Sequence, residues 1–210
     1  MENYIFINGR RIDLTDDQTA QIQASFHEPT TGMKSQEVML SQVAVGDTVK
    51  IGGHEMVTLE HKEGTTALIR KELLSKAQRF GDNNNYDGSD VDDMCNEFAG
   101  EIGAAVGEEN VIAHTVDLTS DDGLKDYGEI QRRASLLTAD RYRKYVEVLD
   151  KHKIDGWWWL ATPYSTKRHE NDSWIKCVAP SGYIGNGLCH RDVGGVRPFC
   201  ILKSTIFVSD

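Results

Sequence analysis

The chain has 210 residues, of which 39% are hydrophobic, enough for one domain with a sizeable core or for a small module followed by such a domain. Four cysteines in a chain of this length exclude a disulfide-dense mini-protein. They form no C-x-x-C pair, which disfavours zinc ribbons, ferredoxins and thioredoxin-like redox sites; they are Cys95, Cys177, Cys189 and Cys200. The net charge of −10 argues against a nucleic-acid partner.

The first predicted element is a hairpin at Tyr4–Leu14, whose central Asn-Gly pair is a strong signal for a two-residue turn. A capping box at Thr15–Gln18 then predicts a helix that ends near Phe26. The segment His27–Ser35 contains proline and glycine and indicates a linker. Residues 1–35 are therefore predicted to form a separate N-terminal hairpin-helix module.

The next segment is predicted to form an antiparallel sheet. Val38–Leu59 alternates in polarity and is interrupted at Gly46-Asp47 and Gly52-Gly53, which indicates two or three strands. Thr66–Ile69 is a further predicted strand. We expect Lys71–Gln78 to form a helical turn or a short helix.

The central part of the chain is predicted to contain the main helices. A polar loop at 81–88 leads to Ser89, a favourable N-cap for a helix over about Asp90–Ala99. The inward face of that helix is expected to carry Val91, Met94, Cys95 and Phe98. Val111–Leu118 is predicted to be a strand.

A second helix and a strand-rich C-terminal part complete the predicted domain. Ser135–Leu137 reads as a strand, and Thr138 caps a helix to about Leu149. The inward residues of that helix are predicted to be Tyr142, Tyr145, Val146 and Leu149. The last strands are predicted at Trp157–Ala161, Trp174–Val178, Arg197–Leu202 and Ile206–Val208. With helices in the middle and strands near the ends, the predicted class is α+β.

The loop at 81–88 is the first candidate for chemistry. It begins like an EF-hand loop at Asn83, but its twelfth position is Met94, where calcium needs a carboxylate. A turn with a helix cap is therefore the preferred interpretation. The alternative is a single calcium ion held by Asp82, Asn84, Asp87 or Asp90. The histidines form no metal-binding pair, and no nucleotide-binding or hydrolase motif is present, so we predict no metal, no cofactor and no catalytic residues.

Three consecutive tryptophans form the sharpest local feature. In a strand, Trp157 and Trp159 would share one side and Trp158 the other. The run favours a central core strand, because Leu160 continues it and Pro163 ends it. An aromatic binding platform is the alternative.

Two further features concern charge. Arg197 follows a Gly-Gly-Val segment and is predicted to pin a loop by hydrogen bonds to backbone carbonyls or a carboxylate, with anion binding as the alternative. Between Phe80 and Glu129, fourteen residues are acidic and only Lys125 is basic. This acidic block indicates a solvated face, and the alternative is a site for a cation or a basic partner.

The segments Gly156–Pro163 (GWWWLATP) and Gly194–Pro198 (GGVRP) resemble the motifs W-W-x-L-[RA]-S-P and G-V-R-P of a C-type-lectin-like domain family of phages and gut-associated bacteria. Phe80–Phe98 and Ser135–Tyr145 fit the same family. The resemblance covers about residues 36–210 and implies a C-type-lectin-like domain there. Two departures are the Ala-Thr pair before the first proline and the missing calcium-lectin signatures Glu-Pro-Asn, Gln-Pro-Asp and Trp-Asn-Asp, which puts calcium-mediated sugar binding in doubt.

Several members of that family look like variable proteins of diversity-generating retroelements, in which error-prone reverse transcription at adenines rewrites a cassette near the 3′ end of the gene. The resemblance implies a variable region at about 160–198 and a ligand-binding function. Asn codons mutated in this way never yield Lys, Glu, Gln, Met or Trp, and Gly185–Asp192 contains none of these types. Lys167 and Glu170 would be fixed, or arise from other adenine-containing codons, and Trp174 would belong to the scaffold.

The implied contact face combines side chains that offer both area and hydrogen bonds. It comprises Tyr164, Arg168, His169, Asn171, Asp172, Tyr183, Asn186, Leu188, His190, Arg191 and Asp192. The residues expected to hold this face rigid are Trp157, Trp159, Trp174, Arg197 and Phe199. The partner implied is an unidentified protein or cell-surface ligand, and association of identical chains is left open.

Two alternative functions come from other classes. The C-terminal Gly-Val-Arg is similar to the ending of formylglycine-generating enzymes, which implies that Cys177, Cys189 or Cys200 approach one another and bind Cu(I). The other is a structural phage or cell-surface component, attached through residues 1–26. No apolar run approaches the ~20 residues that span a bilayer, and no signal peptide is visible. We expect synthesis in the cytoplasm with reduced thiols, and a final place on a virion or cell surface is left open.

Overall fold

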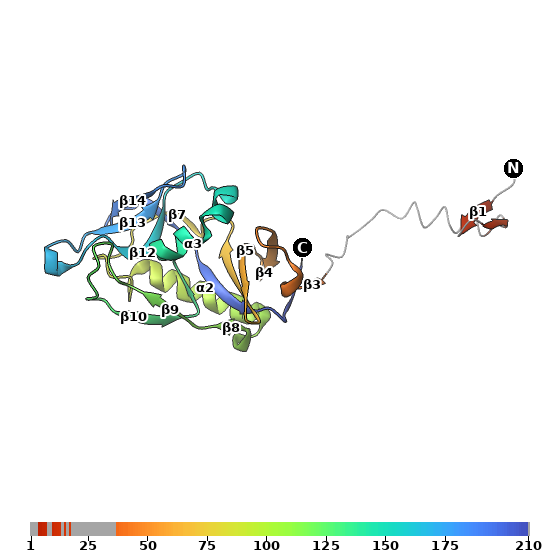
Figure 1. Ribbon diagram of the computed structural model, residues 1–210, viewed down its shortest axis with the longest axis horizontal. Helices are drawn as coiled ribbons and strands as arrows, with labels where there is room; N and C mark the ends of the chain where they lie inside the picture. Colours follow the sequence, from red (N-terminus) through yellow and green to blue (C-terminus); the bar gives the residue numbers. More distant parts are fainter. Residues whose placement is uncertain (1–3, 8–9, 14, 16, 18–36, 210) are drawn as a thin grey trace. The chain divides into compact units, whose positions relative to one another are not determined.

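The computed structural model describes residues 4–7, 10–13, 15, 17 and 37–209 (Figure 1). Spatial contacts divide the chain into two units, Met1–Gln36 and Glu37–Asp210, so the division falls at the end of the predicted linker. In the first unit, β1 (Tyr4–Ile7) and β2 (Arg10–Asp13) pair antiparallel, as predicted for the hairpin. The predicted linker, with most of the predicted capping box and helix, lies outside the described residues.

The second unit combines two α-helices with many short strands. The helices are α2 (Asp90–Val106) and α3 (Ala139–Leu149), with the short 3-10 helices η1 (Leu40–Gln42), η2 (Glu108–Asn110), η3 (Asp150–His152) and η4 (Lys167–His169). The first strands are β3 (Glu37–Met39), β4 (Thr48–Ile51), β5 (His54–Lys62), β6 (Thr65–Arg70), β7 (Ser75–Gln78), β8 (Val111–Ile112), β9 (His114–Asp117) and β10 (Glu129–Arg132). The later ones are β11 (Ala134–Ser135), β12 (Trp158–Pro163), β13 (Trp174–Val178), β14 (Ile184–Leu188), β15 (Gly194–Val196), β16 (Phe199–Lys203) and β17 (Phe207–Ser209). This mixture agrees with the predicted α+β class.

The strands form two main sheets. One has eight strands in the order β11-β16-β6-β5-β4-β17-β3, with β8 beside β16. The other has five strands in the order β14-β13-β12-β15-β7, with β15 parallel to β12. In Figure 1, β12, β13 and β14 lie at one end of this unit and β3 and β4 at the other. Glu37 of β3 pairs with Ser209 of β17, so the two ends of the unit meet.

Both faces of the eight-stranded sheet are covered. Neighbouring residues of β6 illustrate this, because Leu68 packs in the cluster that contains Phe98 of α2, whereas Ile69 packs in the cluster that contains Tyr145 of α3. Successive side chains of a strand point to opposite faces, so a strand buried on both sides reads as a continuous apolar run. A third cluster joins the five-stranded sheet to the start of α2 and contains Trp159.

The predicted starts of both helices are confirmed. The side-chain oxygen of Ser89 accepts a hydrogen bond from the Asp92 N–H, and Thr138 accepts one from the Arg141 N–H. The predicted end of the first helix near Ala99 is wrong, because Ile102 extends the buried face by one turn and the helix ends only before Gly107. Within the described residues, no helix has the length and apolar character needed to cross a membrane.

Two other local predictions need correction. Lys71–Gln78 is not helical, because its last residues form β7, which pairs with β15 through Gln78 and Gly194. Val146 was predicted to face inward but is 36% exposed, since it lies at the edge of the buried stripe of α3. Local periodicity does not reveal the pairing of β7, because its partner lies far away in the sequence.

The remaining corrections concern strand limits. The strand predicted at Val111–Leu118 is divided, because β8 pairs with β16 whereas β9 pairs with β10. Of the strand predicted at Ser135–Leu137, only Ser135 joins a sheet, as part of β11. The other predicted strands of residues 37–209 are present, with limits shifted by a few residues.

Candidate functional site

The tryptophan run contributes side chains to both faces of the five-stranded sheet. Trp158 packs edge-to-face with Tyr142 at a centroid distance of 5.7 Å, and Trp159 packs against Phe80 at 6.0 Å. Both rings are buried, which confirms the predicted core strand for these two residues. Trp157 precedes β12 and is only half-buried. The predicted alternation therefore holds, but one side of it opens to the surface.

Strand β14 is the edge strand of the five-stranded sheet, and it lies next to the Trp157 and Trp159 rings. Its register places Gly187 opposite Ile175 and Gly185 opposite Cys177 of β13. A Cβ atom on Gly187 would lie 2.6 Å from the Trp159 ring, closer than real Cβ contacts. The indole thus occupies the space that a side chain on β14 would fill. No strand was predicted over Ile184–Leu188, so β14 is an addition to the predicted fold.

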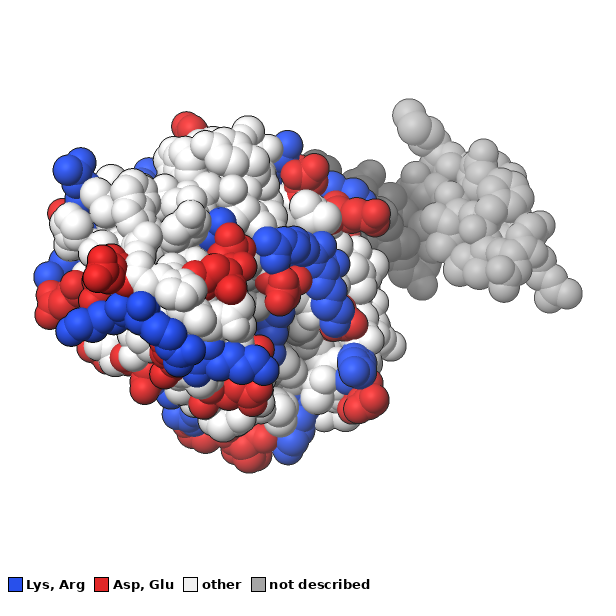
Figure 2. Space-filling view, turned by 60° about the vertical axis from the view of Figure 1, so that its left-hand side comes forward, with Lys and Arg blue, Asp and Glu red and all other residues white. Residues whose placement is uncertain are grey.

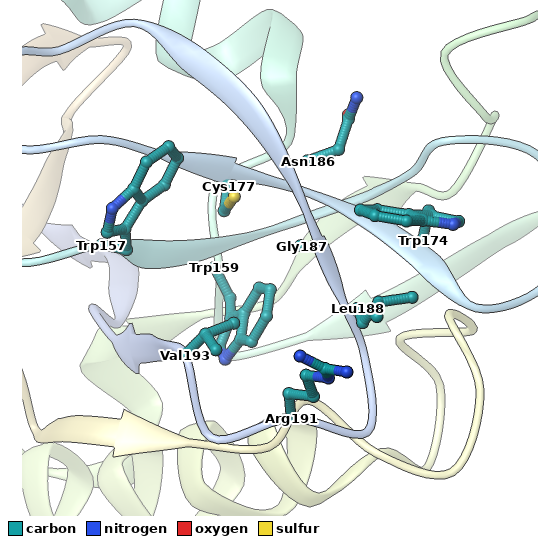
Figure 3. A pocket seen from close by; sticks show the side chains of 9 residues that line it. All are labelled: Trp157, Trp159, Trp174, Cys177, Asn186, Gly187, Leu188, Arg191 and Val193. Carbon is teal, nitrogen blue, oxygen red and sulfur yellow. The ribbon is translucent and has the colours of Figure 1, made fainter.

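The rings and β14 enclose a pocket with a volume of about 290 Å³, which we call the Trp174 pocket. Its lining residues are Trp157, Trp159, Trp174, Cys177, Asn186, Gly187, Leu188, Arg191 and Val193 (Figure 3). Trp174 and Leu188 pair across β13 and β14 and therefore share one face of the sheet. The Trp174 side of the pocket is open to solvent, since that residue is 40% exposed.

A second group of predicted contact residues lies on the loop around η4. The Asp122 carboxylate accepts hydrogen bonds from Ser120 at 2.5 Å and from Ser165 at 2.6 Å, and lies 3.0 Å from His169 Nδ1. These interactions lower the pKa of Asp122, with the Ser120 hydrogen bond as the largest cause. Arg168 is paired with another carboxylate, that of Asp126. The polar side chains of this loop thus hold it to the segment 120–126.

The side chain of Asn84 also holds the loop around η4 in place. That side chain is fully buried, and its Nδ2 donates to the carbonyls of Ser165 at 2.9 Å and Trp174 at 2.8 Å. Its Oδ1 accepts from the Tyr127 hydroxyl at 2.8 Å. Asn84 therefore positions the loop and the start of β13, and it is not available as a ligand for calcium.

The other residues of the calcium alternative are engaged in ion pairs. Asp82 and Asp90 both bind Arg79, and Asp87 binds Arg132. Within the described residues, no three His, Cys, Asp or Glu side chains are grouped to hold a metal ion. The turn with its Ser89 cap is the interpretation that agrees with these contacts.

Many carboxylates of the acidic block are paired with basic side chains that lie outside it. Besides the pairs above, Asp92 binds Arg132, Glu108 binds Arg133, Asp121 contacts Lys176 and Arg143, and Glu101 contacts His54. Figure 2 shows Lys and Arg interleaved with Asp and Glu on one face of the molecule. The predicted face is therefore not simply solvated, because part of its charge is compensated by the protein itself.

Arg197 has the role predicted from its sequence context. Its Nε donates to the Arg70 carbonyl at 2.8 Å, and its Nη2 lies 3.2 Å from the carbonyls of Lys71 and His152. The side chain is buried, and burial lowers its pKa to about 10. The guanidinium therefore ties residues 70–71 and residue 152 to its own segment and does not face an anion site.

The predicted contact residues divide between these places. Asn186, Leu188 and Arg191 line the Trp174 pocket, whereas Tyr164, His169 and Asn171 line a second hollow of about 290 Å³ with Asp121, Asp122 and Ser165. Tyr183 packs edge-to-face on Trp157 at 5.5 Å. His190 and Asp192 are exposed beside the pocket, and Asp172 is half-buried with its carbonyl bonded to the Asn84 N–H. The sequence did not indicate Val193, Gly187 or Cys177 as pocket residues.

The four cysteines are buried and free. Cys177 and Cys189 share one core cluster with Cys95, whereas Cys200 belongs to a different cluster. Burial raises the pKa of Cys177 and of Cys200 to about 12. A metal-binding or nucleophilic cysteine needs the opposite environment, one that favours the thiolate.

No protein-family model, no curated protein and no solved structure matches this chain. The residues of the site are suited to recognition. Aromatic rings supply apolar area, and the neighbouring amide and guanidinium supply hydrogen bonds.

Proposed function

We propose that this protein binds a ligand without transforming it, through the Trp174 pocket and the adjoining residues 188–193. The observation that carries the proposal is an open aromatic pocket, one of whose walls, the Trp159 ring, is anchored in the core. Trp159, the buried wall, donates a hydrogen bond from Nε1 to the Gln78 carbonyl at 2.8 Å. A wall that is ordered before binding lowers the entropic cost of association.

The proposed scaffold is a C-type-lectin-like domain over residues 36–210. The two motifs that carry the resemblance lie side by side, since Trp158 of β12 is paired with Gly195 of β15. Residues 160–198, the proposed variable region, include β13, β14 and the loops on either side. A rigid sheet with exposed loops at its edge can accept changes in the loops without loss of the core.

We test the binding proposal with a fragment library of neutral, anionic and cationic one-ring compounds, screened by ligand-observed NMR against the full chain. Hits should disappear in the double variant Trp174→Ala/Leu188→Ala. They should persist in Phe207→Ala, which removes an aromatic side chain that is 64% exposed on the other sheet. Compounds should be recovered unchanged after prolonged incubation. Absence of hits, equal loss in both variants, or conversion of a compound would overturn the proposal.

The origin of the contact surface is a separate proposal, namely diversification by a retroelement. Sequencing the DNA downstream of the gene tests it. A near-copy of the segment that encodes residues 160–198, differing at adenines and lying beside a reverse transcriptase gene, is the expected result. Without such a copy the diversification proposal fails, whereas the binding proposal is judged by its own experiment.

The enzymatic alternative has less support from the site. The cysteines it requires are buried with raised thiol pKa values, and Cys200 lies in a different core cluster from Cys177 and Cys189. We therefore propose binding and no catalytic step.

A further inference from the structure

Arg191 stands apart from the other arginines of residues 37–209. Its guanidinium forms no hydrogen bond and no ion pair within the described part of the chain, not even with the carboxylate of the neighbouring Asp192, which is exposed. Each of the others donates to a carboxylate or a backbone carbonyl; they are Arg70, Arg79, Arg132, Arg133, Arg141, Arg143, Arg168 and Arg197. The chain has a net charge of −10, so carboxylates are in excess, and a guanidinium without a carboxylate partner is unusual in it.

The position of Arg191 gives this charge a context. Figure 3 shows its side chain between those of Val193 and Leu188, at one end of the Trp174 pocket. No residue that lines the pocket is acidic. The Trp159 indole N–H is already bonded to Gln78, so this wall offers its apolar ring. The pocket therefore combines an apolar interior with a positive charge at its edge.

The size of the pocket limits what it holds. Its volume of about 290 Å³ is at the lower end of the ~300–1,000 Å³ typical of ligand pockets. That space suits a single aromatic ring or a group of similar size. A planar ring also matches the indole walls, because aromatic pairs gain from edge-to-face and offset contacts.

From these observations we infer that the ligand is a carboxylate attached to one aromatic-sized apolar group, with the ring in the Trp174 pocket and the carboxylate on Arg191. This inference rests on the proposed binding function and adds the chemical class of the ligand. The planar guanidinium pairs with a carboxylate through two parallel N–H···O bonds. An ammonium ligand finds no carboxylate among the lining residues.

The test compares 3-phenylpropanoate with its neutral amide, 3-phenylpropanamide, which have the same ring and chain. Binding to the full chain is followed by tryptophan fluorescence, since three of its four tryptophans line the pocket. At low salt the carboxylate should bind about tenfold more tightly than the amide, as expected for a charge-assisted hydrogen bond. This preference should shrink as ionic strength rises.

Variants assign the preference to one residue. Arg191→Gln should weaken binding of the carboxylate about tenfold, and the affinity for the amide should stay within about twofold. Arg133→Gln removes a surface guanidinium paired with Glu108 and should change neither affinity. If the amide binds as tightly as the carboxylate, or if Arg191→Gln leaves the preference intact, the inference is wrong while the binding function stands. If neither compound binds and the fragment screen is also empty, both proposals fall together.

Discussion

The guanidinium of Arg197 lies 5.2 Å from the ring centre of Trp158, so the two sequence motifs of this chain form one structural unit. Their strands are parallel neighbours, with Trp158 opposite Gly195. Trp158 packs toward α3, while Arg197 reaches the backbone of residues 70, 71 and 152. The pair thereby supports the sheet whose edge carries the Trp174 pocket.

Replacing this guanidinium should destabilise the fold. Arg197→Lys leaves buried carbonyls without a donor, because an ammonium cannot match the planar fork. We expect the free energy of unfolding, measured in urea, to fall by about 2–4 kcal/mol. Arg133→Lys, at an exposed ion pair, should change it by less than about 0.5 kcal/mol. Equal effects of the two substitutions would contradict the structural role of Arg197.

The pocket depends on a missing side chain at Gly187. In Gly187→Ala the new methyl group would lie 2.6 Å from the Trp159 ring, so the indole must move. We predict a loss of about 1–3 kcal/mol in unfolding free energy and altered tryptophan fluorescence. Gly100→Ala is the control, because a Cβ there meets nothing within 4 Å and α2 should gain up to about 1 kcal/mol. A stabilised Gly187→Ala variant would show that the ring is not held as described.

Local chemistry sufficed to predict the helix starts. Ser89 and Thr138 cap their helices through hydrogen bonds within a few residues, so the pattern carries the whole signal. Strand β7 shows the opposite case, because its partner β15 lies more than a hundred residues away. Likewise, the glycines of β14 give no sequence signal for a strand. The reason for them appears only in the structure, where the Trp157 and Trp159 rings occupy the space of their missing side chains.

The candidate site was predictable only in part for the same reason. Asn186, Leu188 and Arg191 were expected at a contact surface, and they line the Trp174 pocket. Arg168 and His169 were expected in the same role, but their acidic partners lie on the segment 120–126, which the local sequence does not connect with them. Residue type alone does not distinguish a free contact from an internal ion pair.

A buried histidine should make stability depend on pH. Burial, followed by the charge of Arg141, lowers the pKa of His114 from 6.5 to about 3, and the ring is bonded to Ser135 at 2.9 Å. The unfolded chain therefore binds a proton that the folded chain does not, and this contribution is complete above pH 6.5 and is lost as the pH falls toward 3. Between pH 7.5 and 5.5 the unfolding free energy should drop by roughly 1–2 kcal/mol.

His114→Gln isolates this effect from the other histidines. The variant should lack that part of the decline between pH 7.5 and 5.5, since glutamine does not titrate. Unfolding in urea at several pH values measures both proteins. Parallel pH profiles for the two would mean that His114 is protonated in the folded protein, contrary to its buried contacts.

The loop around η4 should loosen when its carboxylate anchor is neutralised. Asp122 accepts from Ser120 and Ser165 and contacts His169, and its pKa is lowered by these partners. In Asp122→Asn we expect faster amide hydrogen exchange in residues 165–171, because an amide replaces one acceptor oxygen with a donor. Asp140→Asn, at a carboxylate that is 92% exposed, should leave that exchange unchanged. Acidification to about pH 4 should not reproduce the effect of Asp122→Asn, because the lowered pKa keeps the folded carboxylate charged at that pH. Unchanged exchange in Asp122→Asn would mean that Asn84 and Asp126 suffice to hold the loop.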